Sequence, residues 1–296
     1  LHRHAYPLIQ RSLAWARLHP LMGEIPAALL DPEHPEARGL SLLALLLLLA
    51  STLFALVVHA TGHEGLLYNL DSYLVNTFEA LRTPLMDSFF AAMAQLGDWQ
   101  VLLPLSLVLF AWLWQQHYRH AAKHWLAAVG FGALLSLNLF WLESTTNAIL
   151  NTPLHSGQLM TAMAVYGFLA ILIAREYSER RRLPIYAIAA ALVLGIALAR
   201  IYLGASRLSG VMGALTLGLA WVALLGIGYR HHPAERIAQG RLAVLALLTL
   251  AISAGWHNLH HHEKTLERYT IGRELQTLEA QQWWCEGWHE LPAYRA

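Results

Sequence analysis

The chain has 296 residues, of which 56% are hydrophobic and only 13% are charged. An ordinary soluble domain carries about 25% charged residues, so this composition excludes a typical soluble globular protein and indicates one that faces lipid. The formal net charge of +1 excludes nucleic-acid binding through a strongly basic face, and the single cysteine excludes an internal disulfide.

The N-terminal segment, residues 1–38, precedes the first long apolar stretch. Within it, residues 6–21 have apolar side chains at helical spacing beside arginines, which suits a helix on the membrane surface or the tail of an upstream domain. The chain begins at Leu1 without a recognisable cleavable signal, and residues 283–292 read like the start of a further domain. We therefore expect both ends to be boundaries within a longer chain.

About seven later stretches are long and apolar enough to be transmembrane helices, which need about 20 mostly apolar residues. In chain order they are residues 39–59, 101–114, 125–142, 159–174, 183–203, 211–228 and 242–256. Residues 62–100 mix charged and apolar side chains at helical spacing, so there we expect one or two amphipathic helices at the membrane surface. The sequence therefore predicts an all-α, polytopic membrane helix bundle.

The placement of lysine and arginine predicts the orientation of this bundle, because cytoplasmic loops are enriched in both. With the N-terminus inside, 13 of the 20 Lys and Arg residues fall on the inner side. We therefore expect a bacterial inner-membrane protein with a cytoplasmic N-terminus and a periplasmic C-terminus. Two polar loops, residues 151–158 and 199–210, then lie on the periplasmic side, at the ends of helices that can pack together.

These two loops resemble a known family. Ser156 and Gly157 open one predicted helix, and the run from Arg200 to Gly204 ends another and is followed by Leu208 and a further helix. Over about residues 62–230 this framework is similar to the type 2 phosphatidic acid phosphatase superfamily, which is related to vanadium haloperoxidases. The family's second motif is Pro-Ser-Gly-His, and its third is Ser-Arg followed at fixed spacing by His and then Asp.

The resemblance implies a domain organisation. Residues 1–38 would be a cytoplasmic linker, and residues 39–230 a phosphatase-like core of six helices. Residues 231–256 would add one C-terminal transmembrane helix, and residues 257–296 would be periplasmic. The flanking segments further resemble bacterial fusions in which a DedA-type domain precedes the phosphatase and an LssY C-terminal domain follows it.

The catalytic positions, however, hold other residues. In the family one histidine attacks phosphorus, an aspartate orients it and a second histidine protonates the leaving group. Here the nucleophile position is Ser206, the orienting position is Gly210 and the acid position is Gln158. No lysine or arginine occurs between residues 135 and 153, where the first motif belongs. The resemblance therefore implies a pseudo-phosphatase with degenerate catalytic motifs.

The anion-binding chemistry is better retained. Arg200, Arg207, Ser156 and the amides around Gly157 at a helix start suit an anionic head group. The simpler alternative is that the two arginines only extend to the membrane interface.

Three further features stand outside the motifs. His155 is an alternative nucleophile or acid, because imidazole titrates near neutral pH, or else a plain interfacial histidine. Glu143 is an acid near the outer end of a predicted span, which makes it a functional candidate. The cluster of His257, His260, His261 and His262 has a weak metal-ligand spacing, and we expect no metal there.

The preferred hypothesis is a catalytically degenerate membrane protein that binds an anionic lipid, such as phosphatidate or a polyprenyl phosphate, or scaffolds protein partners. It needs no cofactor and binds no nucleic acid. The first alternative is an active lipid phosphate or polyprenyl pyrophosphate phosphatase with a site rearranged around His155, Glu143 and Arg200. The second is a purely structural subunit of a membrane complex.

Overall fold

The computed structural model describes residues 37–60, 70–71, 73–74, 77–78, 81–146, 157–175, 177–231 and 237–280, with the backbone alone for residues 37–38, 135–146, 179, 231 and 261–280. No β-strand occurs in these ranges. The main helices are α3 (Ala37–Ala60), α5 (Pro84–Gln95), α6 (Trp99–Gln115), α7 (Arg119–Thr146), α8 (Gly157–Ala174), α9 (Glu179–Tyr202), α10 (Leu208–His231) and α11 (Gln239–Ala280).

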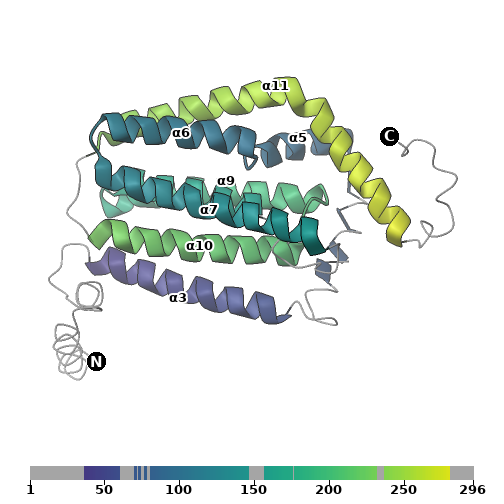
Figure 1. The fold of residues 1–296 in the computed structure, drawn as a ribbon, viewed down its shortest axis with the longest axis horizontal. Helices are drawn as coiled ribbons and strands as arrows, with labels where there is room; N and C mark the ends of the chain where they lie inside the picture. The colour runs from purple at the N-terminus through teal and green to yellow at the C-terminus, as the bar shows by residue number, and fades with distance from the viewer. Residues whose placement is uncertain are drawn as a thin grey trace.

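The long helices lie side by side in one bundle (Figure 1). α8 is its centre and contacts α6, α7, α9, α10 and α11. Thirteen of the 18 residues of α8 are buried, which is expected because a helix that is apolar on all sides needs neighbours on all sides. α3 packs on α10, and α11 packs on α5 and α6.

Six helical stretches of the described residues are long and apolar enough to cross a membrane, and they include α11 up to His260. α7 is not among these six, but it covers the predicted span at residues 125–142 and lies alongside the other helices (Figure 1). Apolar side chains on α3 and α11 remain exposed, as lipid-facing residues must, among them Leu45, Leu48, Leu247 and Ile252. The predicted all-α polytopic membrane bundle is confirmed.

Close packing between helices depends on small residues, as is usual where lipid removes the hydrophobic drive for helix association. A Cβ added at Gly132 of α7 would lie 2.9–3.2 Å from Thr161 of α8. One added at Gly218 of α10 would lie 2.9 Å from the Met163 side chain. α7 and α10 therefore approach the central helix more closely than any side chain would allow.

One end of the bundle is held by arginines, and we call it the arginine end. Arg175, buried just after α8, donates from Nη1 to the carbonyl of Tyr229 in α10 at 3.1 Å. Arg182 donates to the carbonyls of Arg175 and Tyr177, both at 2.7 Å. Arginine near a helix C-terminus satisfies carbonyls that lack intrahelical partners and complements the helix dipole. Arg175 thus joins the end of α8 to α10, and Arg182, in the first turn of α9, holds the connection that follows α8.

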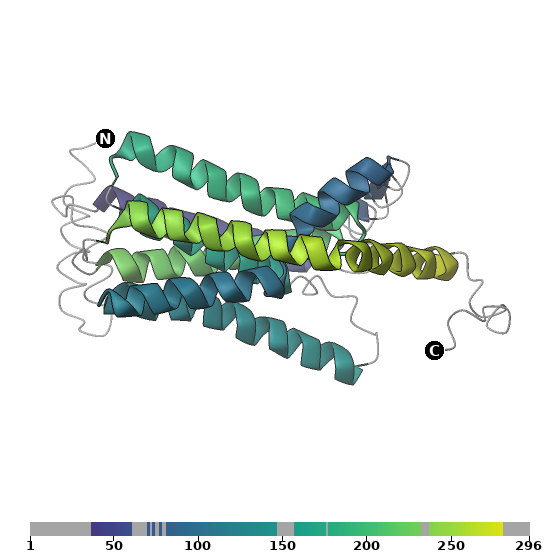
Figure 2. The same ribbon diagram turned by 90° about the horizontal axis from the view of Figure 1, so that it is seen from above.

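Two elements differ in extent from the sequence-based expectation. Part of the predicted surface region at residues 62–100 forms α5, which continues through a short turn into α6 and joins it in one apolar stretch of 32 residues. α11 has 42 residues and runs well past the predicted end at residue 256, projecting beyond the bundle (Figure 2). Residues 6–21 and 283–292 lie outside the described part of the chain.

Candidate functional site

The end of the bundle opposite the arginine end holds the motif positions, and we call it the motif end. It contains the starts of α6, α8 and α10 and the last turn of α9. Arg200 lies in that last turn, where a cation is favoured by the helix dipole. Its exposed fraction is only 6%, so this guanidinium is buried between helices.

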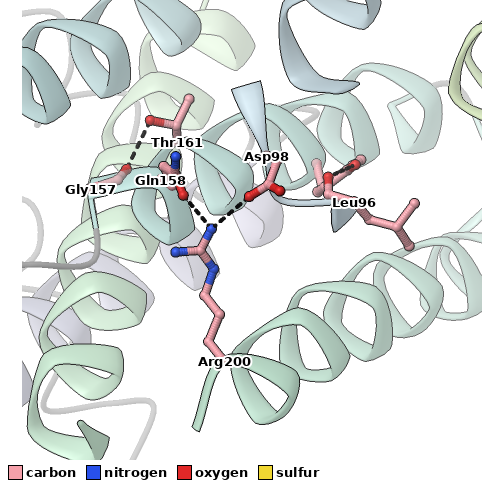
Figure 3. A network of polar contacts seen from close by, with 7 residues as sticks. Leu96, Asp98, Gly157, Gln158, Thr161 and Arg200 are labelled. Atoms are coloured by element: carbon pink, nitrogen blue, oxygen red, sulfur yellow. Dashed lines mark hydrogen bonds and ion pairs between the residues drawn. The ribbon is translucent and has the colours of Figure 1, made fainter. Parts of the chain in front are cut away.

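Arg200 joins three elements through one nitrogen. Its Nη2 donates to Oε1 of Gln158, in the first turn of α8, at 2.6 Å. The same Nη2 lies 3.2 Å from Oδ1 of Asp98, the residue that precedes α6 (Figure 3). The resemblance implied that Gln158 and Arg200 belong to one site, and the structure brings their side chains into direct contact.

The rest of the guanidinium is less well satisfied. Nε of Arg200 is buried and has no hydrogen-bond partner among the described residues. Leaving a buried donor without a partner costs about 1–3 kcal/mol, and more for a charged group. The arrangement therefore has unused donor capacity that suits a ligand with acceptor oxygens.

Two hydrogen bonds hold α8 in place, one within its first turn and one to the turn before α6. The Thr161 hydroxyl donates to the carbonyl of Gly157 at 2.9 Å, and the Tyr166 hydroxyl donates to the carbonyl of Leu96 at 2.7 Å. Leu96 lies in the turn between α5 and α6, so α8 is fixed to the segment that carries Asp98 (Figure 3).

The start of α10 is occupied by a second carboxylate. Asp71 accepts from the Ser209 amide at 3.1 Å through Oδ1 and from the Ser209 hydroxyl at 2.6 Å through Oδ2. Both residues are buried. A carboxylate at a helix N-terminus satisfies a free amide and complements the dipole, so Asp71 acts as a cap contributed from 138 residues away.

A tight turn connects α9 to α10 and carries Ser206. Gly204 adopts a φ of 71°, which glycine tolerates without strain. The amides of Ala205 and Ser206 donate to the carbonyl of Arg200 at 2.9 and 3.3 Å, closing the turn at the helix end. Arg207, at the end of this turn, is exposed.

Aromatic packing secures the same helix end. Tyr202 contacts the rings of Phe78 and Phe90, with centroids 5.9 and 4.2 Å away. The Arg82 guanidinium lies 5.7 Å from the Tyr202 ring centroid and pairs with Asp87 at 3.2 Å. The segment before α6 thus packs against the end of α9, next to Arg200.

The other predicted site residues are distributed as follows. Gly157 is buried in the first turn of α8, and Gly210 is buried in the first turn of α10. His155, Ser156 and the Glu143 side chain lie outside the described part of the chain. His257 is buried on α11 and takes no part in the contacts of Arg200.

Sequence reasoning missed Asp98 and Asp71. Asp98 stands between Gly97 and an apolar run, which is a helix-start pattern that could have placed it at the beginning of α6. Asp71 lies in a mixed segment without such a pattern, so only the tertiary structure reveals its role.

Comparison with known proteins identifies the fold that carries these residues. The chain matches the crystal structure of the first transmembrane PAP2 type phosphatidylglycerolphosphate phosphatase from Bacillus subtilis with a TM-score of 0.54, over 64% of this chain and 98% of that one, at 20% identity. The chain has the PAP2 phosphatase fold.

Sequence similarity points in the same direction as the PAP2 fold. Phosphatidylglycerophosphatase B from Bacillus subtilis is 24% identical over 180 residues, 56% of this chain and 87% of the relative. No family model matches the chain. The two similarities support a relationship to the PAP2 superfamily and a lipid-phosphatase-like membrane protein. The degenerate motifs and the DedA and LssY flanks stay predictions.

Proposed function

We propose that the protein is a catalytically inactive, lipid-phosphatase-like membrane domain that binds an anionic lipid head group at Arg200, or scaffolds an assembly through it. We further propose that it resides in a bacterial inner membrane with the motif end toward the periplasm. The lipid class is a phosphate ester, such as phosphatidate or a polyprenyl phosphate.

One observation carries the binding proposal. The Arg200 guanidinium is buried, uses a single nitrogen for both of its side-chain contacts, and leaves Nε without a partner among the described residues. A phosphate group presents several oxygens and accepts two parallel N–H bonds from arginine, so it would complete this donor set. The contact with Gln158 keeps the guanidinium at the start of α8.

The absence of turnover is proposed from the residue types at the motif positions. A glutamine amide cannot give up a proton near neutral pH, so Gln158 cannot serve as a general acid. Ser206 is a hydroxyl at the nucleophile position, and the motif supplies no imidazole to activate it. Gly210 carries no side chain that could orient a base.

A second candidate is an active lipid phosphate phosphatase, which the similarity to phosphatidylglycerophosphatase B favours. It would need a catalytic group away from the three changed positions, such as His155 together with Glu143. The purely structural alternative would leave Arg200 with its two protein partners and no ligand.

The first test is phosphate release by the purified protein. The substrates are phosphatidate, lysophosphatidate, phosphatidylglycerophosphate and a polyprenyl pyrophosphate, each in detergent micelles. We expect no release above the protein-free rate. Enzyme-like turnover that is lost on His155→Ala would instead establish the active alternative. The triple variant Gln158→His, Ser206→His, Gly210→Asp, assayed in parallel, asks whether the motif residues alone restore activity.

The second test is binding of short-chain phosphatidate. We expect Arg200→Gln to weaken it by roughly tenfold or more, since a charge-assisted bidentate contact is lost. Arg82→Gln is the matched control, because it removes an equal charge from the motif end without touching Arg200. Equal binding by the wild type and Arg200→Gln would overturn the proposal and leave the structural alternative.

A further inference from the structure

Asp98 occupies the N-cap position of α6, but its side chain forms no capping hydrogen bond. Its φ of −83° and ψ of 150° are typical of an N-cap, and its carbonyl accepts from the amides of Val101 and Leu102 at 3.0 and 2.9 Å. An aspartate in this position normally accepts a hydrogen bond from an amide of the first helical turn. Asp98 forms no such capping bond, and its Oδ1 contacts Arg200 instead.

The preceding helix provides an internal comparison. Thr83, the N-cap residue of α5, has a φ of −136° and a ψ of 149°, and its side chain accepts from the Met86 amide. Two adjacent helices therefore begin with similar backbone geometry, and only one is capped by its own side chain. The Asp98 carboxylate contacts Arg200, and it forms no capping bond with its own helix.

The contact between Asp98 and Arg200 is open to competition. It is a single-point contact at 3.2 Å, through the nitrogen that also donates to Gln158 at 2.6 Å. The Asp98 side chain is 16% exposed, against 7% for Arg200, so the carboxylate is the more solvated partner. A phosphate that takes two N–H groups of the guanidinium would make the stronger pair.

A displaced Asp98 carboxylate has another favourable position. The first turn of α6 offers amides without intrahelical partners and the positive end of the helix dipole. Breaking a buried ion pair is normally costly because it leaves a buried charge uncompensated. Here a rotation of one side chain would move that charge from the guanidinium to the helix start, where the helix dipole would compensate it.

We propose that Asp98 is a built-in counterion that a lipid phosphate displaces from Arg200, whereupon the carboxylate caps α6. This inference rests on the proposed binding of an anionic lipid at Arg200 and adds its regulation. Asp98 is then a positioning residue that sets the affinity of the site and couples lipid binding to the start of α6.

The affinity test compares two isosteric substitutions. Asp98→Asn keeps the size and capping ability of the side chain but removes the competing charge, so short-chain phosphatidate should bind roughly tenfold more tightly. Asp87→Asn is the matched control, because Asp87 also pairs with an arginine at 3.2 Å at the motif end but does not contact Arg200. It should leave the affinity unchanged.

Hydrogen exchange tests the movement itself. On saturation with phosphatidate, amides in the first turn of α6 should exchange more slowly in the wild type. The effect should vanish in Asp98→Ala, which binds but cannot cap. A thermal melt of each variant checks that it is folded, and Asp98→Asn provides a capping-competent comparison if Asp98→Ala does not fold.

The outcomes separate this inference from the proposed function. If Arg200→Gln weakens binding as expected but Asp98→Asn binds no more tightly than the wild type, the counterion role is wrong and lipid binding at Arg200 stands. An equal gain in Asp98→Asn and Asp87→Asn would also overturn it, since the effect would be one of general surface charge. Lipid binding that is unaffected by Arg200→Gln would overturn both.

Discussion

At the scale of single residues, two acids from the segment before α6 satisfy polar groups at the motif end. Asp98 contacts the Arg200 guanidinium, and Asp71 bonds both the amide and the hydroxyl of Ser209. Charged residues are scarce in this chain, and burying one is unfavourable unless it is paired and hydrogen-bonded. Each acid therefore has a specific partner. Asp71 accepts two hydrogen bonds from Ser209, whereas Asp98 contacts Arg200 through one oxygen.

The Asp71 contact is expected to be important for stability. Asp71→Ala leaves the buried amide and hydroxyl of Ser209 without their acceptor, which should lower the free energy of unfolding by about 1–3 kcal/mol. Asp71→Asn, which retains one acceptor oxygen, should cost less. Thermal unfolding of the purified protein in detergent measures both.

A double-mutant cycle assigns the effect to this contact. Ser209→Ala removes the hydroxyl, so the double variant with Asp71→Ala should lose less stability than the sum of the two single variants. Strictly additive losses would mean that Asp71 stabilises the fold through other contacts.

At the scale of helices, the central helix α8 packs against α6, α7, α9, α10 and α11. α7 and α10 approach it at Gly132 and Gly218, where an added Cβ would lie within 3 Å of a neighbouring side chain. The same approach holds the start of α8, and hence Gln158, at a fixed position relative to the end of α9. Helix packing thus determines the geometry of the Arg200 contacts.

Two glycines of α7 test this packing. A Cβ at Gly132 would lie 3.0 Å from the Cα of Thr161, whereas one at Gly130 would meet nothing within 4 Å. Gly132→Ala should therefore destabilise the protein by about 1–3 kcal/mol through overpacking. Gly130→Ala should be neutral or stabilising by up to about 1 kcal/mol, because alanine favours helix. Equal melting temperatures for the two variants would contradict close α7–α8 packing.

At the scale of the whole molecule, the two ends of the bundle differ in chemistry. At the arginine end, Arg175 joins the C-terminal ends of α8 and α10, and Arg182 ties the start of α9 to the end of α8. The motif end brings together helix N-termini, two acids and Arg200. Positive side chains at one end match the enrichment of basic residues on the cytoplasmic side of membranes. On this rule we predict that the motif end faces the periplasm.

Cysteine labelling of intact cells tests that orientation. In a Cys285→Ser background, Ala205→Cys at the motif end should react with a membrane-impermeant maleimide without permeabilisation. Ser178→Cys, at the arginine end, should react only after permeabilisation. Both positions are exposed in the structure, so the reverse pattern would place the motif end in the cytoplasm.

The sequence by itself determined the membrane class and the positions of the helices. Apolar length is a local property, and each predicted span falls on a helix of the bundle, from residues 39–59 in α3 to residues 242–256 in α11. Helix ends were less predictable, because α11 continues through polar residues as far as Ala280. Motif spacing placed Gln158 and Arg200 in two loops of one predicted site, and in the structure their side chains are in contact.

Only the tertiary structure decided which acids act at the motif end. Asp98 is 102 residues from Arg200 in the chain, and Asp71 is 138 residues from Ser209. Their contacts depend on how α6, α9 and α10 pack around α8, and no local pattern of apolar or polar residues encodes that arrangement. The sequence alone predicted that Arg200 could bind an anion. Only helix packing determined that the Asp98 carboxylate of the same chain already contacts this arginine.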